Sequence, residues 1–275
     1  MKRFIIYNFS ILFFINITAQ SLESVKSDEE EYAVSLLNKD ENFTYNIERN
    51  SKEETLVVSI GGACLAAIQI YNLGLRKAAY PFDVIYSDLD GIINAIKTDF
   101  AYFIDIKYLT RKRFNNKYHL YNPSYNFIFP HDLHSDNGKK LNLKYEREKI
   151  IDFQEKYKRR IARFKDLENF KGKVYFLRTY SKNVQPDTIG NLIKLRDLIS
   201  KKFPKLNFEI IVVTLVSKEV KQEIPELIKY FYANDLGLFS KKAEQNFYNI
   251  FNLLEIKMSP LKPTSFFYVA NKRTF

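Results

Sequence analysis

Residues 55–73 read TLVVSIGGACLAAIQIYNL, and this stretch decides the fold. Thr55–Ile60 is a short apolar run rich in β-branched residues, which predicts a buried strand, and Gly61-Gly62 after it predicts a tight turn. From Cys64 onward apolar residues recur at helical spacing until Gly74, which is placed to end the helix. The stretch therefore predicts a strand, a glycine turn and a helix, with the cysteine at the turn.

The same two patterns alternate along the rest of the chain. Apolar runs predict strands at 82–86, 126–129, 173–178, 208–215 and 265–270, and 3.6-residue periodicity predicts helices at 90–100, 143–169, 187–203 and 241–254. Residues 111–125 are basic and predict irregular structure. Strands that are apolar throughout are typical of a sheet covered on both faces. We therefore expect a single α/β domain over residues 55–275, with a mixed, largely parallel sheet and helices on both faces.

Composition and charge narrow the function classes. Apolar residues make up 46 % of the 275 residues and aromatic residues 16 %, which is ample for a packed core. The formal net charge is +11, but the basic residues are spread along the chain and match no known nucleic-acid motif. We expect a Lys-rich solvated surface and no nucleic-acid partner; attraction to acidic glycans or anionic membranes is the alternative.

The N-terminus has the layout of a secretory signal peptide. Residues 1–20 begin with Lys2 and Arg3, continue through an apolar run and end in the small and polar residues Thr18-Ala19-Gln20. The run is too short and too polar to predict a transmembrane span, and no other stretch does so. We expect a secreted or periplasmic protein with a polar linker at 21–54. The alternative is a buried N-terminal element in a cytoplasmic protein.

The single cysteine is a candidate nucleophile. One cysteine excludes an intrachain disulfide, and Cys64 lies at a predicted strand-to-helix turn. Helix N-termini favour the thiolate, and nearby backbone N–H groups, here of Ala63, Cys64 or Leu65, are placed to bind an oxyanion. Gly61 and Gly62 would leave room for substrate. The alternative is that Cys64 is a small buried core residue.

A nucleophilic cysteine needs a base, and the chain has three histidines. His131 follows the predicted strand 126–129, and if that strand joins the sheet of Thr55–Ile60, His131 emerges at the same edge as Cys64. His119 lies in the basic region, and we expect it on the surface. His131 and His134 have the spacing of a partial metal pair, for which Asp132 or Asp136 could supply a third ligand, but so short a spacing at a strand end is weak evidence for a metal site. We expect neither a metal nor a cofactor.

Two carboxylates and one arginine are further candidates. Asp83, in Pro81-Phe-Asp83, and Asp132, next to His131, could orient the base; each could instead be a turn or capping carboxylate. Arg178 ends the predicted strand 173–178, where it could hold a substrate carboxylate or phosphate. The alternative for Arg178 is a structural ion pair.

Several short motifs occur together in a known order. They are Val58-Ser-Ile-Gly-Gly-Ala-Cys64, Leu73-Gly-Leu-Arg76, Pro81-Phe-Asp83, Phe129-Pro-His-Asp132, Arg159-Arg-Ile-Ala-Arg-Phe164 and Val174-Tyr-Phe-Leu-Arg178. In this order the chain resembles, between residues 56 and 178, an uncharacterised, mainly bacterial family described as papain-like cysteine peptidases. The family usually has Trp where this chain has Val84. The resemblance implies that Cys64 is the nucleophile and His131 its partner. It also implies a cysteine-bearing helix paired with an antiparallel sheet that carries the histidine, whereas the alternating pattern predicts α/β.

These observations predict a thiol hydrolase with a peptide or other acyl-type substrate, in which Cys64 attacks an acyl carbon. Transfer to an amine or alcohol, as in an acyltransferase, fits the same residues. A non-catalytic binding protein for an anionic glycan or lipid head group is the alternative, with Cys64 as a packing residue. A phosphate- or sugar-handling protein that uses Gly61-Gly62 is a third reading, although that loop is too short for a P-loop.

Overall fold

The computed structural model describes residues 54–114, 116–135, 146–180, 188–215, 224–237 and 240–258. The expected signal peptide at 1–20, the linker at 21–54 apart from Glu54, and the expected strand at 265–270 lie outside these residues. The described part forms an α/β domain with two sheets.

The larger sheet is parallel. Its order is β1 (Thr55–Ser59), β5 (Lys173–Thr179), β6 (Asn207–Thr214) and β7 (Ile228–Tyr232). Each neighbouring pair runs parallel. The central strands β5 and β6 are buried along most of their length, as expected for strands with helices on both sides.

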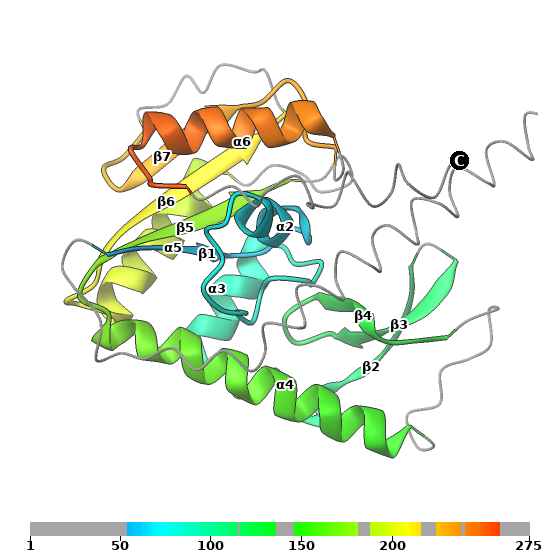
Figure 1. Cartoon of the computed structure of the whole chain (residues 1–275). Helices are drawn as coiled ribbons and strands as arrows, with labels where there is room; N and C mark the ends of the chain where they lie inside the picture. The colour runs from blue at the N-terminus through cyan, green and yellow to red at the C-terminus, as the bar shows by residue number, and fades with distance from the viewer. Residues whose placement is uncertain are drawn as a thin grey trace, which may run out of the picture.

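The two faces of this sheet support two apolar clusters. Along β5, Val174 and Phe176 belong to one cluster, and Leu177 belongs to the other. The first face is covered by α3 (Leu89–Lys97), α4 (Arg147–Lys165) and α5 (Ile189–Lys202), the second by α2 (Leu65–Asn72) and α6 (Lys241–Leu253). Figure 1 shows α6 and α4 on opposite sides of the sheet. Helices on both faces confirm the predicted fold class.

The smaller sheet is antiparallel, in the order β2 (Thr110–Phe114), β3 (Lys117–Asn122) and β4 (Phe127–Ser135). It lies beside α4 (Figure 1). The prediction of irregular structure at 111–125 was wrong. The basic strand β2 is largely exposed, so it lacks the apolar alternation that marks a half-buried strand.

The expected strand of His131 and the strand before Cys64 lie in different sheets, contrary to the condition set from the sequence. The predicted strand 126–129 is part of β4, in the antiparallel sheet, and does not join β1. β4 also continues through Pro130, past residue 129, where the predicted strand ended. Proline is tolerated there because the register of β4 is interrupted by a bulge at this point, where no ladder hydrogen bond is needed.

The predicted strand 82–86 is a turn, in which only Tyr86 makes an isolated bridge, to Ile128. Phe82 is fully buried, and its ring packs against those of Phe127 and Phe164. The apolar run therefore reflects a turn that fills the core, because burial produces the same pattern in either conformation.

Other predicted elements are confirmed with shifted ends. The predicted helix 143–169 is α4 followed by the 3-10 helix η5 (Asp166–Asn169), within the part that is described. The side chain of Thr188 caps α5, and residue 187, where the helix was predicted to begin, lies outside the described residues. β7 was not predicted.

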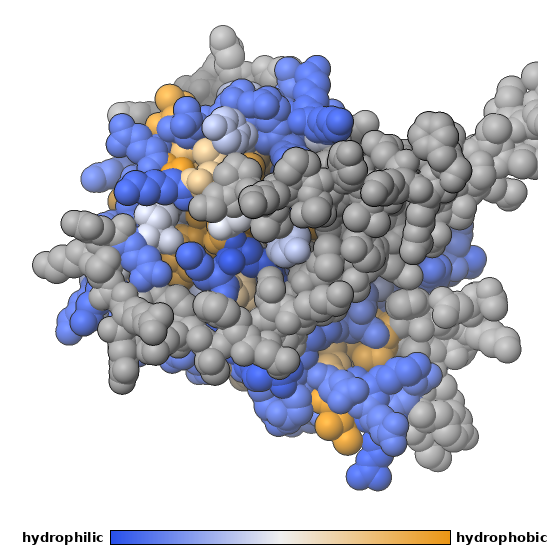
Figure 2. All heavy atoms as spheres, in the orientation of Figure 1, coloured by the Kyte–Doolittle hydropathy of each residue, from blue (hydrophilic) through white to orange (hydrophobic). Residues whose placement is uncertain are grey.

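Hydrophilic side chains cover most of the described surface on the face shown in Figure 2. Among the helices of the described segments, none combines the length and apolarity needed to cross a bilayer.

Candidate active site

The cysteine side of the site is a sharp turn between β1 and α2. Gly61 and Gly62 have positive φ angles of 75° and 96°, which only glycine adopts readily. Cys64 is the N-cap residue of α2, and its carbonyl accepts the N–H of Ile68 at 3.0 Å. The N–H groups ahead of Ile68 in the first turn precede the helical ladder, so partial positive charge gathers next to the thiol.

The turn has no room for side chains at either glycine. A Cβ atom at Gly61 would lie 2.3 Å from Ser87 Oγ, and one at Gly62 would lie 2.0 Å from the carbonyl oxygen of Thr179. Both distances are far below van der Waals contact. The space beside these glycines is therefore filled by neighbouring chain and is not a substrate cavity as the sequence had suggested.

The backbone N–H groups of both glycines donate hydrogen bonds to serine hydroxyls. The N–H of Gly61 donates to Ser59 Oγ at 3.4 Å, and the N–H of Gly62 donates to Ser87 Oγ at 3.2 Å. Both serines are buried. These two donors are therefore engaged within the protein, and the oxyanion donors expected at Ala63, Cys64 or Leu65 stay a prediction.

Cys64 itself is buried, with 5 % of its surface exposed, and it forms no disulfide. α2 is enclosed on almost every side, because all of its residues except Tyr71 are buried. A helix of this kind belongs to the core.

His131 lies in an irregular part of β4. Leu120 pairs with Phe129 and the adjacent His119 pairs with His134, so residues 130–133 bulge out of the ladder. Such bulges redirect side chains and often occur next to active sites. His131 borders a cavity of about 380 Å³, whose other lining residues are Asp132, Leu133, Lys149, Asp152, Phe153, Glu155, Lys156 and Arg159. Cys64 does not line this cavity.

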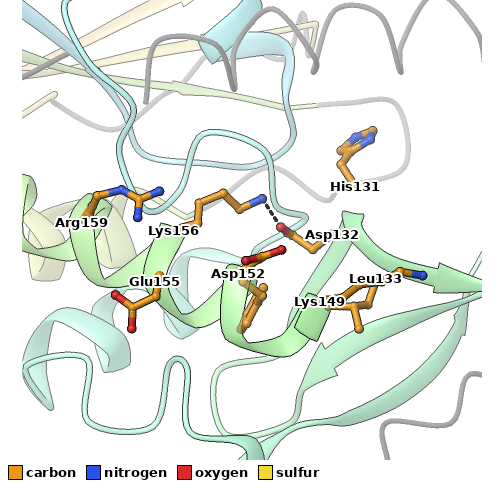
Figure 3. A pocket seen from close by; sticks show the side chains of 9 residues that line it. His131, Asp132, Leu133, Lys149, Asp152, Glu155, Lys156 and Arg159 are labelled. Carbon is orange, nitrogen blue, oxygen red and sulfur yellow. Dashed lines mark ion pairs between the residues drawn. The ribbon is translucent and has the colours of Figure 1, made fainter. Parts of the chain in front are cut away.

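Asp132 is bound to α4. It forms an ion pair with Lys156 and accepts a hydrogen bond from the hydroxyl of Tyr157 at 3.1 Å. Figure 3 shows the side chains of His131 and Asp132 pointing in different directions, with Asp132 directed at Lys156. This geometry favours the structural reading of Asp132 over the orienting role.

Asp83 also has structural partners. Its Oδ2 atom accepts from Arg76 at 2.8 Å and from the N–H of Tyr80 at 2.9 Å, and its side chain is 1 % exposed. It therefore stabilises the turn that contains Pro81, as the alternative interpretation proposed.

Arg178 is fully buried beneath the glycine turn. Its guanidinium donates to the carbonyl oxygens of Ile60 at 3.0 Å and of Ser87 at 3.3 Å, and it lies over the ring of Tyr180. It belongs to the same parallel-sheet edge as the cysteine turn, as predicted. These two contacts are to backbone carbonyls, and the substrate contact and the ion pair considered from the sequence stay predictions.

The other histidines are placed differently from expectation. His119 is buried, with its Nε2 atom 3.1 Å from the carbonyl oxygen of Phe114, so the surface position predicted for it was wrong. The basic residues of this region lie mainly on the neighbouring strand β2, which is largely exposed, whereas His119 on β3 is buried. The side chain of His134 lies outside the described residues. Within the described segments, no group of three or more His, Cys, Asp or Glu side chains is arranged to hold a metal ion.

The cavity beside His131 is strongly charged. Its lining combines Lys149, Lys156 and Arg159 with Asp132, Asp152 and Glu155. Figure 3 shows Lys156 directed at Asp132. The hydrogen bond from Lys158 lowers the pKa of Glu155, which keeps that carboxylate ionised. Opposite charges in equal number favour polar or charged groups over apolar ones.

Sequence reasoning missed Ser87, which contacts both the glycine turn and Arg178. It lies between a tyrosine and the N-cap residue Asp88 of α3, and no pattern in the sequence distinguishes it from a second capping residue.

Comparison with known families decides where this chain belongs. Residues 55–218, more than half of the chain, match the family described as "Putative papain-like cysteine peptidase (DUF1796)". The chain belongs to this family. The match includes both Cys64 and His131, and it extends past the end of the motifs at Arg178.

A viral protein is also similar to this chain. "Uncharacterized protein R408" of Acanthamoeba polyphaga mimivirus is 27 % identical over 174 residues, which cover 56 % of this chain and 76 % of that protein. The expectation that the papain-like family is mainly bacterial stays a prediction. No solved structure matches the chain significantly.

Proposed function

We propose that this protein is a thiol hydrolase of papain-like type, with Cys64 as nucleophile and His131 as base. The proton of the Cys64 thiol passes to His131, and Sγ forms a bond to the acyl carbon of the substrate. The bond from that carbon to the leaving nitrogen or oxygen breaks, and His131 returns the proton to the leaving group. Water then attacks the thioester with His131 as base, which releases the acid and restores the thiol.

One observation carries the proposal: Cys64 is the N-cap residue of α2, directly after the Gly-Gly turn, in a chain of the papain-like family. That position favours the thiolate and places backbone donors of the helix start beside the reacting atom. His131 supports the proposal because it lies on an antiparallel sheet next to a cavity, as the family resemblance implies for the base.

We propose a peptide substrate with a charged or polar side chain next to the cleaved bond. The cavity beside His131 has a charged lining, in which α4 supplies the lysines, the arginine and two carboxylates and β4 supplies Asp132. An apolar side chain would displace water from these charged groups without offering them a hydrogen bond, which costs free energy. An amine or alcohol that reached the thioester in place of water would make the same site an acyltransferase.

The test is the rate at which iodoacetamide alkylates Cys64 in the folded protein across pH. The wild type is compared with His131→Ala, and with His119→Ala as a matched control because His119 has a backbone partner away from the cavity. We expect an apparent pKa for the Cys64 thiol below the ~8.5 of a free cysteine, raised in His131→Ala but not in His119→Ala. Equal profiles for all three proteins would refute the Cys–His pair.

A binding protein is the second candidate, and the 5 % exposure of Cys64 favours it. In that case Cys64 reacts only when the protein unfolds, at the same rate with or without His131. The net charge of +11 then favours anionic glycans or lipid head groups as ligands.

We also propose export from the cytoplasm, which rests on the signal-like pattern of residues 1–20. Expression of the full chain with a C-terminal tag should yield a processed protein that begins near Gln20 in the exported fraction. An intact N-terminus in the cytoplasmic fraction would contradict this expectation.

A further inference from the structure

The two halves of the proposed site belong to different sheets. Cys64 follows β1 of the parallel sheet, and His131 is on β4 of the antiparallel sheet. No ladder hydrogen bonds join these sheets in the described part of the chain. The spacing of a Cys–His pair must therefore be set by whatever segment contacts both halves.

Ser87 contacts the cysteine half at two points. Its Oγ atom accepts the N–H of Gly62 at 3.2 Å, and its carbonyl oxygen accepts from Arg178 at 3.3 Å. Arg178 also donates to the carbonyl of Ile60 at 3.0 Å, so one guanidinium joins Ser87 to the end of β1. All of these groups are buried, and buried hydrogen bonds of this kind hold a backbone in one position.

The preceding residue, Tyr86, contacts the histidine half. Its N–H donates to the carbonyl of Ile128 at 3.0 Å, and its carbonyl accepts the N–H of Ile128 at 3.1 Å. Ile128 and His131 are in the same strand. Two consecutive residues therefore connect the glycine turn before Cys64 with the strand that carries His131.

We propose that Tyr86 and Ser87 form a strap that fixes the distance between Cys64 and His131, with Ser87 and Arg178 as positioning residues. This inference rests on the proposed function. It assigns Arg178 a role in aligning the site through the glycine turn, in place of the substrate contact expected from the sequence. Because a displacement of the reacting groups by about 1 Å can lower a catalytic rate 10²-fold, a small shift of the strap should lower the rate measurably.

The experiment compares Ser87→Ala with Ser59→Ala in the full chain. Each change removes a buried hydroxyl that accepts a glycine N–H, but only Ser87 is part of the strap. We measure the alkylation of Cys64 against pH, with and without His131→Ala, and the amide exchange of residues 60–65 and 127–131. Where Ser87→Ala fails to fold, Arg178→Lys replaces it, because lysine keeps the charge but cannot hold two carbonyls in the same way.

We expect Ser87→Ala to slow alkylation near pH 6 about 10-fold, equivalent to a rise of about one unit in the apparent pKa of the thiol. Amide exchange should become faster in both segments, whereas Ser59→Ala should affect residues 60–65 alone. The strap is refuted if Ser87→Ala matches Ser59→Ala in both measurements while the dependence on His131 persists. If wild-type alkylation does not depend on His131, the proposed function fails and the positioning role fails with it.

Discussion

Gly62 offers the sharpest test of the cysteine turn. In Gly62→Ala, the new Cβ atom would lie 2.0 Å from the carbonyl oxygen of Thr179, at a φ angle of 96°. Backbone strain at such an angle costs about 1–3 kcal/mol. Overpacking against a backbone atom that cannot move aside costs about 1–3 kcal/mol more. We expect a loss of roughly 2–6 kcal/mol in the free energy of unfolding, a large share of the ~5–15 kcal/mol typical of a domain.

Chemical denaturation with guanidinium measures this loss, and the alkylation rate of Cys64 should change with it. Gly190→Ala is the matched control, since the nearest atom to its Cβ is Thr188 Oγ1 at 3.8 Å and its φ angle is negative. Alanine favours a helix over glycine by up to ~1 kcal/mol, so the control should be unchanged or slightly more stable. A Gly62→Ala protein within ~0.5 kcal/mol of wild type would refute the geometry of the turn.

Three further changes test other parts of the structure. Desolvation raises the pKa of Asp99, but hydrogen bonds from Lys165 and Lys202 outweigh it, so the pKa lies below its usual value of 3.8. Asp99→Asn should cost about 0.5–1 kcal/mol at pH 7, and urea titrations should show this difference vanish as the pH falls through the folded-state pKa, below 3.8. Arg178→Met leaves two buried carbonyls without their donor and should lower the free energy of unfolding by about 2–4 kcal/mol in the same assay; a neutral result would contradict the contacts to Ile60 and Ser87. Asp132→Asn should lower stability by about 1–3 kcal/mol but leave the pH profile of Cys64 alkylation unchanged; a shifted profile would restore Asp132 as the group that orients His131.

The backbone conformation of Asp99 allows the wild type and Asp99→Asn to be compared with little added backbone strain. Asp99 has a φ angle of 53°, in the left-handed region that asparagine tolerates almost as well as aspartate. The substitution therefore removes the charge with little added strain, and the pH dependence reports the ion pairs alone. The side chain is 57 % exposed, which is why the expected effect is small.

Burial explains which elements the sequence could predict. β5 and β6 are apolar along their length and α4 places Phe153, Tyr157 and Phe164 on one buried stripe, so both types of element leave a periodic signal. β2 is basic and exposed, and β7 is a short strand with partly exposed residues. Neither strand has a fully buried face, so neither shows the alternation of apolar and polar residues by which a strand is predicted.

The sequence could predict only the part of the candidate site that is formed by consecutive residues, around Cys64. The order strand, Gly-Gly, Cys64, helix is contained in consecutive residues, and the structure has that order. Which sheet receives the strand of His131 depends on long-range pairing, and the run at 126–129 is equally suited to either sheet. Ser87 was missed for the same reason, because its partners Gly62 and Arg178 are distant in the chain.

The division of the site between two sheets also separates what stabilises the fold from what aligns the chemistry. The glycine turn, Ser87 and Arg178 are buried, so changes there should alter stability and reactivity together. His131 lies in a bulge with no β3 residue opposite it and is only partly buried, so the core depends on it much less. Substitution of the residue that acts as the base should therefore change the alkylation rate of the Cys64 thiol and leave the midpoint of unfolding unchanged. Among the described candidates Cys64, Asp83, Asp132, Arg178 and His131, the last is the side chain whose placement best meets that condition.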